Sequence, residues 1–183
     1  MAETVTEVIN YPLRVTYNSV VLGITGLGET SLTVERNDVP VDSDQYGASI
    51  LNLLSGGENM RISMTLRQWN GRNLKDALPW SSYYKDDTDE RNTIGAIPGR
   101  SALANGGAEL LLHRTADADA VTKKDIKIYK AIVEEMGDVT LSPDAPNGFP
   151  ITFLALVDTS KTDGAMLGEI GTSNASTLIS GGS

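Results

Sequence analysis

The stretch Asn59-Met-Arg-Ile-Ser-Met-Thr-Leu-Arg-Gln-Trp69 carries the clearest structural signal in this chain. Its apolar residues alternate with polar ones: Met60, Ile62, Met64 and Leu66 against Arg61, Ser63, Thr65 and Arg67. A period of two is typical of a β-strand that places one face on a hydrophobic core and the other in water. The stretch therefore predicts an amphipathic strand around which the rest of the chain is arranged.

A short helix is expected directly after this strand. Asn70-Gly71 predicts a turn, and the segment 73–78 is typical of a helix. Pro79 would end that helix, because proline has no backbone N–H to donate and restricts the residue before it. The central unit is therefore predicted to be an amphipathic strand followed by a small helix.

Further strands are expected on both sides of the central one. The segments 13–17 and 20–22 flank Asn18-Ser19, two residues that tolerate turns, and this pattern predicts a tight hairpin. Other strands are predicted at 31–36, 109–115, 124–133, 138–141 and 151–157. The start of 109–115 also fits a helical turn, and 46–54 fits a strand or a helix, ended by Ser55-Gly56-Gly57. These elements predict a mainly β fold, a β-sandwich or partly open barrel with one short flanking α-helix.

Length and composition limit the classes of protein to consider. The 183 residues suit one domain, which we place at 1–171, followed by a flexible Ser- and Gly-rich tail at 172–183. The net charge of −9 gives an electrostatic field of the wrong sign for binding nucleic acid through its phosphates. The chain has no cysteine, which removes disulfides, thiolate nucleophiles and cysteine-based zinc sites. It also has no run of about 18 apolar residues, so we expect no membrane segment.

A glycine cluster at 23–28 only partly fits a phosphate-binding loop. A dinucleotide fingerprint opens a helix, and a P-loop ends in Gly-Lys-Ser/Thr. Here the cluster is followed by Glu29 and a predicted strand. We therefore interpret it as a plain turn and expect no nucleotide cofactor.

An acidic segment at 37–45 only partly fits a calcium loop. It contains Asp38, Asp42 and Asp44. A calcium loop that began at Asp42 would need a carboxylate at its twelfth position, where Leu53 stands. We therefore expect a solvated acidic loop and no metal site.

The residues available for catalysis are few. His113 is the single histidine, so no histidine metal site or Ser-His-Asp triad forms without it, and no Gly-x-Ser-x-Gly elbow is present. Carboxylates are plentiful, but the sequence does not tell which of them meet in the fold. We expect a structural histidine and a chain that is not an enzyme.

The segment 80–107 is expected to be a long loop. It places Trp80, Tyr83 and Tyr84 beside the acidic run 86–90 and shows no periodicity. Loops of this length are usually functional or disordered. Exposed aromatic residues among polar ones are typical of protein contacts, while packing of these rings on the rim of the core is the alternative.

The order of elements resembles that of the tail tube (major tail) proteins of tailed bacteriophages. The resemblance lies in the hairpin 15–23, the segments 32–35 and 38–42, Gly56-Gly57-Glu58 and the strand 60–66, and at the end in 148–158 and 167–171. It covers the chain from about Pro12 to Gly171, apart from 80–107, which we expect to be an insertion. The matched features are turn chemistry and element order.

The resemblance implies a structural protein of the virion. Copies of the chain would close into a hexameric ring with a continuous inner β-barrel, and rings would stack into a tube that delivers DNA. The expected partners are further copies, the tape measure protein, the tail terminator and baseplate proteins. DNA would pass without specific binding, and the tube would be assembled in the host bacterial cytoplasm and remain in the virion tail.

Residue roles follow from the resemblance as hypotheses. The polar face of the inner strands would line the lumen with Thr33, Glu35, Ser63 and Thr65. Contacts between subunits or rings are expected from Asp38, Asp42, Asp44, Arg61, Arg67, Trp80, Tyr83 and Tyr84, with both arginines paired to acidic neighbours. The connection 37–57 would stack one ring on the next, and the N-terminal arm and the C-terminal tail would add contacts between rings.

Two other functions fit the same sequence. A tail-completion or baseplate ring would share the fold and differ only in its place in the tail. A monomeric β-sandwich that binds carbohydrate would use Trp80, Tyr83 and Tyr84 as one exposed stacking platform. The carbohydrate module would need these aromatic rings exposed to solvent in the free protein, whereas a tube could bury them between subunits.

Overall fold

A computed structural model describes the fold over residues 11–43, 49–69, 75, 78, 81–95, 107–139, 148–162 and 164–171. Within these residues the chain forms nine strands: β1 (Leu13–Tyr17), β2 (Val20–Ser43), β3 (Ser49–Trp69), β4 (Ser81–Lys85), β5 (Glu90–Ile94), β6 (Ala108–Arg114), β7 (Ile126–Met136), β8 (Phe149–Ala155) and β9 (Gly168–Ile170). The prediction of a mainly β fold is confirmed.

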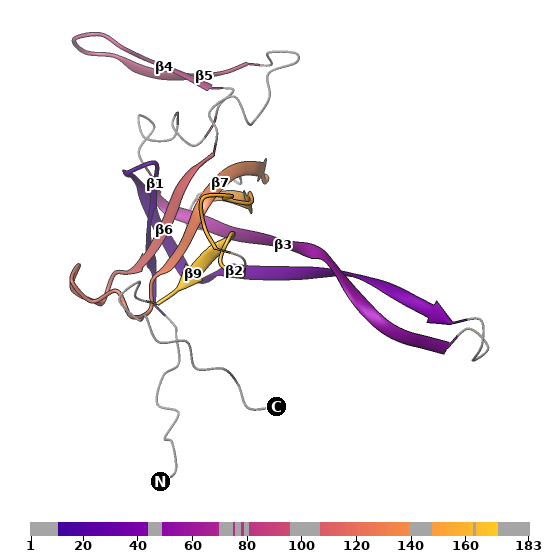
Figure 1. Cartoon of the computed structure of the whole chain (residues 1–183). Helices are drawn as coiled ribbons and strands as arrows, with labels where there is room; N and C mark the ends of the chain where they lie inside the picture. The colour runs from indigo at the N-terminus through magenta and orange to yellow at the C-terminus, as the bar shows by residue number, and fades with distance from the viewer. Residues whose placement is uncertain are drawn as a thin grey trace.

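Six of the strands close into an antiparallel barrel (Figure 1). Their order is β6-β1-β2-β3-β8-β7, and the pairing of Leu110 with Ile128 joins β7 back to β6. The expected sandwich or partly open barrel is therefore corrected to a closed one, because the hydrogen bonds between β6 and β7 complete the circle. The short strand β9 pairs with β7 at 126–128, beside the point where β8 leaves it.

The interior of the barrel is filled by side chains from every strand of the circle. The apolar positions of the central strand are all buried: Met60, Ile62, Met64 and Leu66. Phe153 of β8 is fully buried, and its ring lies 5.3 Å from that of Tyr17. The Tyr17 hydroxyl donates a hydrogen bond to Ala131 O at 3.0 Å, and its burial raises the pKa of Tyr17. Since the interior is a packed core, contacts with other molecules must use the outside of the barrel.

The segment after β3 is described only at two points. Leu78 is 1 % exposed and belongs to the core, while Lys75 is exposed. The rest of the predicted helix at 73–78 and the predicted turn at Asn70-Gly71 lie outside the described residues. The same holds for the N-terminal residues 1–10 and the tail 172–183.

The predicted glycine turn at 23–28 is wrong, because β2 continues through it. Strand β2 pairs Thr25 with Leu66 and then Thr30 with Met64. Between these two pairs, β2 is five residues further along its chain and β3 only two. The extra residues of β2 form a bulge. The glycines permit this irregular backbone inside a long strand.

The acidic loop predicted at 37–45 is wrong over 37–43, which belong to β2, and residues 44–45 lie outside the described residues. Strands β2 and β3 continue beyond the barrel, pairing Val39 with Leu54 and ending with Ser43 opposite Ser49. We call this two-stranded extension, residues 36–43 and 49–58, the arm; it projects far from the barrel (Figure 1). Gly57, at φ +103°, bends the ribbon instead of ending the strand.

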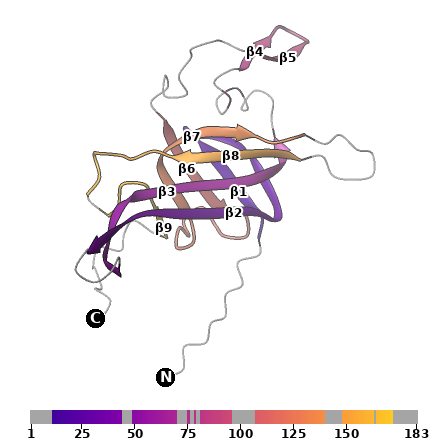
Figure 2. The ribbon, with the colours of Figure 1, turned by 90° about the vertical axis from the view of Figure 1, so that its right-hand side faces the viewer.

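A β-hairpin occupies part of the segment 80–107. Strands β4 and β5 pair with each other, from Ser81 with Ile94 to Lys85 with Glu90. We call residues 81–94 the β4–β5 hairpin; Figures 1 and 2 show it beyond the barrel. Its strands are short and polar, so the pattern of alternation that reveals buried strands is missing.

The remaining predicted strands are displaced by a few residues. The segments predicted at 109–115, 124–133 and 151–157 correspond to β6, β7 and β8. The strand predicted at 138–141 is not formed at residues 138–139, and residues 140–141 lie outside the described residues.

The predicted hairpin turn between β1 and β2 is confirmed. Its backbone conformation predicts how two substitutions at Ser19 change the stability of the fold. Asn18 and Ser19 have φ angles of 49° and 63°, as a type I′ turn requires. Because serine is strained there, Ser19→Gly should raise the free energy of unfolding by up to about 1 kcal/mol. Ser19→Val should lower it, since a β-branched residue resists positive φ. Urea denaturation of both variants measures the two changes, and a stabilised valine variant would contradict this account of the turn.

Candidate functional site: a polar sheet face with two open edges

Strands β2, β3, β8 and β7 form a four-stranded part of the barrel wall (Figure 2). Its outer face is polar. The register places rows of side chains across it. One row runs Ser31, Ser63, Thr152 and Glu135, and the next runs Thr33, Arg61, Leu154 and Ile132. We call this outward side of the four strands the polar face. It is the side opposite the core, as the alternation of burial along β3 and β8 requires.

All four residues proposed to line a lumen lie on the polar face. Thr33 and Glu35 are exposed, and Ser63 and Thr65 are half-buried. The Ser63 and Thr152 hydroxyls form a hydrogen bond at 3.0 Å. Thr152, Glu134 and Glu135 also belong to this face and were not predicted from the sequence. The alternation of β8 could have identified Thr152, whereas the two glutamates flank a bulge that interrupts the period of β7.

Arg61 connects three strands of the polar face by binding two glutamates. Its Nε donates to Glu134 Oε2 at 2.8 Å, and its Nη1 donates to Glu35 Oε2 at 3.1 Å. The hydrogen bond with Glu134 and the negative charges of both glutamates raise the pKa of the Arg61 guanidinium. One cation thus joins β2, β3 and β7 within a single chain.

Arg67 is held by Glu29 at the other end of the face. The guanidinium donates from Nε to Glu29 Oε2 at 2.7 Å and from Nη2 to the second carboxylate oxygen, Glu29 Oε1. This two-point contact raises the pKa of Arg67 and fixes both side chains in one plane. Carboxylates therefore bind both arginines, and the face is net acidic, with Glu29, Glu35, Glu134 and Glu135 against Arg61, Arg67 and Lys130, the last of which is bound to Asp158.

The four-stranded sheet has two open edges in the described part of the chain. Beyond Ile24, β2 has left β1 and pairs with β3 alone. Beyond Ala131, β7 has left β6 and pairs with β8 alone. Each edge presents unpaired backbone N–H and C=O groups, which are a template for another strand.

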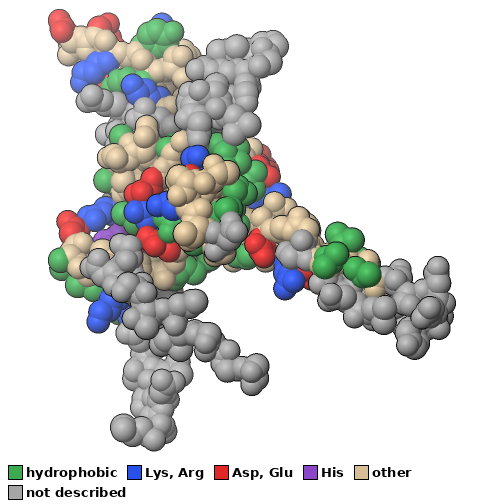
Figure 3. Space-filling view, in the orientation of Figure 1, with side chains coloured by type: hydrophobic (Ala, Val, Ile, Leu, Met, Phe, Trp, Pro, Cys, Tyr) green, Lys and Arg blue, Asp and Glu red, His purple; other side chains and the backbone are tan. Residues whose placement is uncertain are grey.

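The arm carries exposed apolar side chains. Val39 and Leu54 are directly paired and each is 55 % exposed, and Val41 is exposed as well. Figure 3 shows hydrophobic side chains on this projection. A groove of about 420 Å³ lies at its base, lined by Asn37, Gly56, Gly57, Glu58, Asn59, Val157, Gly164, Met166 and Leu167.

The acidic residues expected to make ring contacts are only partly described. Asp38 lies in the arm and forms an ion pair with Arg36 at 2.6 Å. Asp42 also lies in the arm, in β2, and Asp44 lies outside the described residues. The structure therefore brings Asp38 and Asp42 onto the projection, and does not bring them near Arg61 or Arg67.

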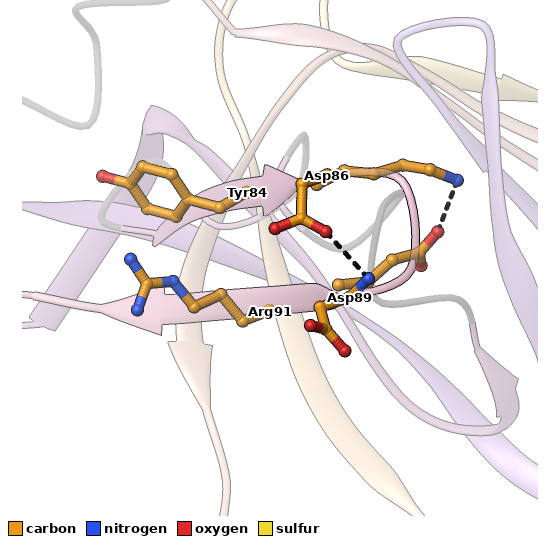
Figure 4. A pocket seen from close by; sticks show the side chains of 6 residues that line it. Tyr84, Asp86, Asp89 and Arg91 are labelled. Atoms are coloured by element: carbon orange, nitrogen blue, oxygen red, sulfur yellow. Dashed lines mark hydrogen bonds and ion pairs between the residues drawn. The ribbon is translucent and has the colours of Figure 1, made fainter.

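The two described tyrosines of the predicted platform do not lie on one face. Tyr83 and Tyr84 are consecutive in β4, so their rings point to opposite faces of the β4–β5 hairpin. Tyr84 is 51 % exposed, and the Arg91 guanidinium lies 4.9 Å from its ring centre (Figure 4). Trp80 lies outside the described residues. The two tyrosines that are described cannot stack on one sugar, which weakens the carbohydrate-binding alternative.

His113 has a structural environment. Its side chain is buried, and Nδ1 lies 2.8 Å from Asp125 Oδ1, which is buried too. Nε2 lies 3.4 Å from Asp117 O. Across the described residues, no group of three or more His, Asp or Glu side chains could hold a metal ion. In that same portion of the chain, no helix is long and apolar enough to cross a membrane.

Comparisons with known proteins add no identification. No protein-family model matches the chain. No curated protein matches it in sequence either. The candidate site is therefore interpreted from its own geometry: a polar and net acidic sheet face, two open edges and an apolar arm.

The loop after β8 forms one wall of the groove. One of its residues, Asp158, makes the stability of the fold depend on pH. Asp158 Oδ1 accepts hydrogen bonds from Ser160 N and Oγ at 3.2 and 2.9 Å and lies 3.2 Å from Lys130 Nζ. These contacts, the bonds from Ser160 first, lower the pKa of Asp158 below its usual value of about 4.

A lowered pKa means that Asp158 stabilises the fold at every pH above the ordinary aspartate range. That contribution should be lost as the pH falls through the lowered pKa, since protonation removes the acceptor charge. Asp158→Asn should therefore be less stable than wild type at pH 7 and should approach it in strong acid. Thermal unfolding of both proteins across the acidic range measures this, and parallel curves would contradict it.

Proposed function

We propose that this chain is a structural protein of a bacteriophage virion, whose copies join edge to edge into hexameric rings and stack into the tail tube. The observation that carries the proposal is the four-stranded sheet with two open edges and a polar outer face. In this role the chain needs no catalytic group and no cofactor. The protein would reside in the virion tail after assembly in the bacterial cytoplasm.

Strand direction supports closure of the ring. Neighbouring strands in the order β2-β3-β8-β7 are antiparallel, so the two edge strands of one copy also run in opposite directions. Rotation about a tube axis lying roughly along the strands keeps their direction. The β7 edge of one copy would then meet the β2 edge of the next as an antiparallel pair. Repetition around a closed ring would satisfy every open edge.

In such a ring the polar face would line the channel. The face offers hydroxyl groups, and its arginines are already bound by carboxylates of the same chain. Proteins grip DNA by neutralising its phosphates with free cations. A net acidic wall supplies no such contact, so DNA would pass without binding.

The arm is suited to contacts between stacked rings. Its exposed valines and leucine form an apolar surface in contact with water. Exposed apolar patches usually mark contact sites. Stacking would bury them against the neighbouring ring, as the connection 37–57 was expected to do. The ends of the stack would contact tape measure, terminator and baseplate proteins.

Electron microscopy tests the proposal directly. Negative-stain images of the purified chain, recorded at several concentrations with its mass in solution, should show hollow rings or tubes with six-fold symmetry. The physical reason is that association satisfies the open edges and buries the apolar arm. A monomer that persists at all concentrations and binds glycans would contradict the proposal and favour a binding module.

Substitutions in the channel test the role of the polar face. Thr33→Lys combined with Thr65→Lys should spare assembly and slow DNA ejection, because free cations would bind passing phosphates. Thr159→Lys combined with Thr162→Lys adds the same charge in an exposed loop off the face and should not slow ejection. Ejection rates of virions that carry each pair give the answer. Equal rates would remove Thr33 and Thr65 from the channel.

A further inference from the structure

The single histidine of the chain lies buried at the end of β6, against the segment that leads to β7. We call this segment, residues 115–125, the β6–β7 connection (Figure 1). The ring of His113 lies between two parts of it. Nδ1 lies 2.8 Å from Asp125 Oδ1, and Nε2 lies 3.4 Å from Asp117 O. One ring therefore bridges the beginning and the end of the connection.

Both oxygens that face the ring are hydrogen-bond acceptors. Asp117 O is a backbone carbonyl, and an ionised Asp125 carboxylate only accepts. A neutral imidazole has one N–H and one bare nitrogen, so it can donate to only one of the two oxygens. The bare nitrogen would then face an oxygen at a site where the His113 and Asp125 side chains are 4 % and 6 % exposed, and water does not compensate the loss. An imidazolium donates to both oxygens.

Other charged groups surround this site. Asp119 Oδ1 lies 4.0 Å from the ring Nε2, and Arg14 of β1 binds Asp119 at 2.8 Å. On β6, Arg114 Nη1 lies 3.5 Å from Asp117 Oδ2. The hydrogen bond from Arg14, and then its charge, lower the pKa of Asp119, which therefore stays ionised where histidines titrate. The remaining charges of this end are Lys123, which is exposed, Lys124, and the ion pair of Lys127 with Glu109 at 3.1 Å.

The two ring protons are not equivalent. A ring with a single proton keeps it on Nδ1, because the Asp125 carboxylate is both charged and closer than the Asp117 carbonyl. Nε2 is then bare and faces Asp117 O. Loss of the second proton therefore removes the hydrogen bond to Asp117 and preserves the one to Asp125.

We propose that protonation of His113 controls whether the β6–β7 connection is fixed to the barrel. As an imidazolium, His113 holds the connection at Asp117 and at Asp125, and loss of its Nε2 proton releases the Asp117 end. Residues 116–121 are otherwise held by turn hydrogen bonds and by ion pairs with arginines, and Asp119 is 80 % exposed, where such a pair stabilises little. The inference concerns this chain alone and does not depend on the proposed tube.

Nuclear magnetic resonance of the wild-type chain tests the proposal without any substitution. Because the chain has one histidine, its ring nitrogen resonances are unambiguous and report which nitrogens carry a proton. Between about pH 5 and about pH 9 they should change from an imidazolium to the Nδ1–H tautomer. Backbone order parameters of residues 116–121 should fall with the same midpoint, from about 0.85 to below about 0.6, while those of β7 stay constant.

Three substitutions identify the groups responsible. Asp125→Asn keeps the shape of the side chain but removes the charge that stabilises the imidazolium, so release should occur at a pH lower by about one unit or more. Asp138→Asn makes the same change in net charge at an exposed position beyond the other end of β7, and should leave the midpoint unchanged. His113→Gln has no titrating group, so the order of residues 116–121 should no longer depend on pH.

Three results would overturn the proposal. The first is a ring that keeps the same protonation over the whole range. The second is a connection that stays rigid after the ring has lost its second proton. The third is a pH dependence that persists in His113→Gln, since another group would then be titrating. None of these results bears on ring assembly, which electron microscopy tests separately.

Discussion

The main constraint on this protein is that strands β2 and β7 continue beyond the ends of β1 and β6, the strands they pair with in the barrel. The barrel satisfies the backbone of β1 and β6, but among the described residues nothing pairs with one edge of β2 and one edge of β7 past the point where those partners end. Unpaired edges promote association with other strands, and soluble proteins usually block them with charges, prolines or covering segments. Here the edges belong to one even-numbered antiparallel sheet, so the proposed pairing between identical copies would satisfy both at once.

The electrostatics of the polar face are consistent with this arrangement. Arg61 and Arg67 would each create a phosphate site if they were free, but internal carboxylates occupy both of them. The Ser63 and Thr152 hydroxyls form a hydrogen bond with each other and make the surface polar. The face is thus polar and net acidic, as the proposed channel for DNA would require.

The sequence predicted the parts of the fold that have a strong period or specific turn chemistry. Met60 to Leu66 and the turn at Asn18-Ser19 were predicted correctly, because burial and positive φ leave direct marks on residue type. The arm was missed because its exposed strand residues, such as Asp38, have the composition of a loop. Glu134 and its contact with Arg61 were missed since pairing across three strands depends on register, which only the folded sheet determines.

Amide hydrogen exchange is the measurement that tests the edge-pairing claim most directly. It should be recorded on the monomer and on the assembled protein, and resolved along β2 and β7. The account predicts that amides of residues 30–36 and 132–136 that face away from β3 and β8 become protected on assembly. If assembly protects only the arm or the β4–β5 hairpin and leaves both edges exchanging as in the monomer, the continuous sheet is contradicted.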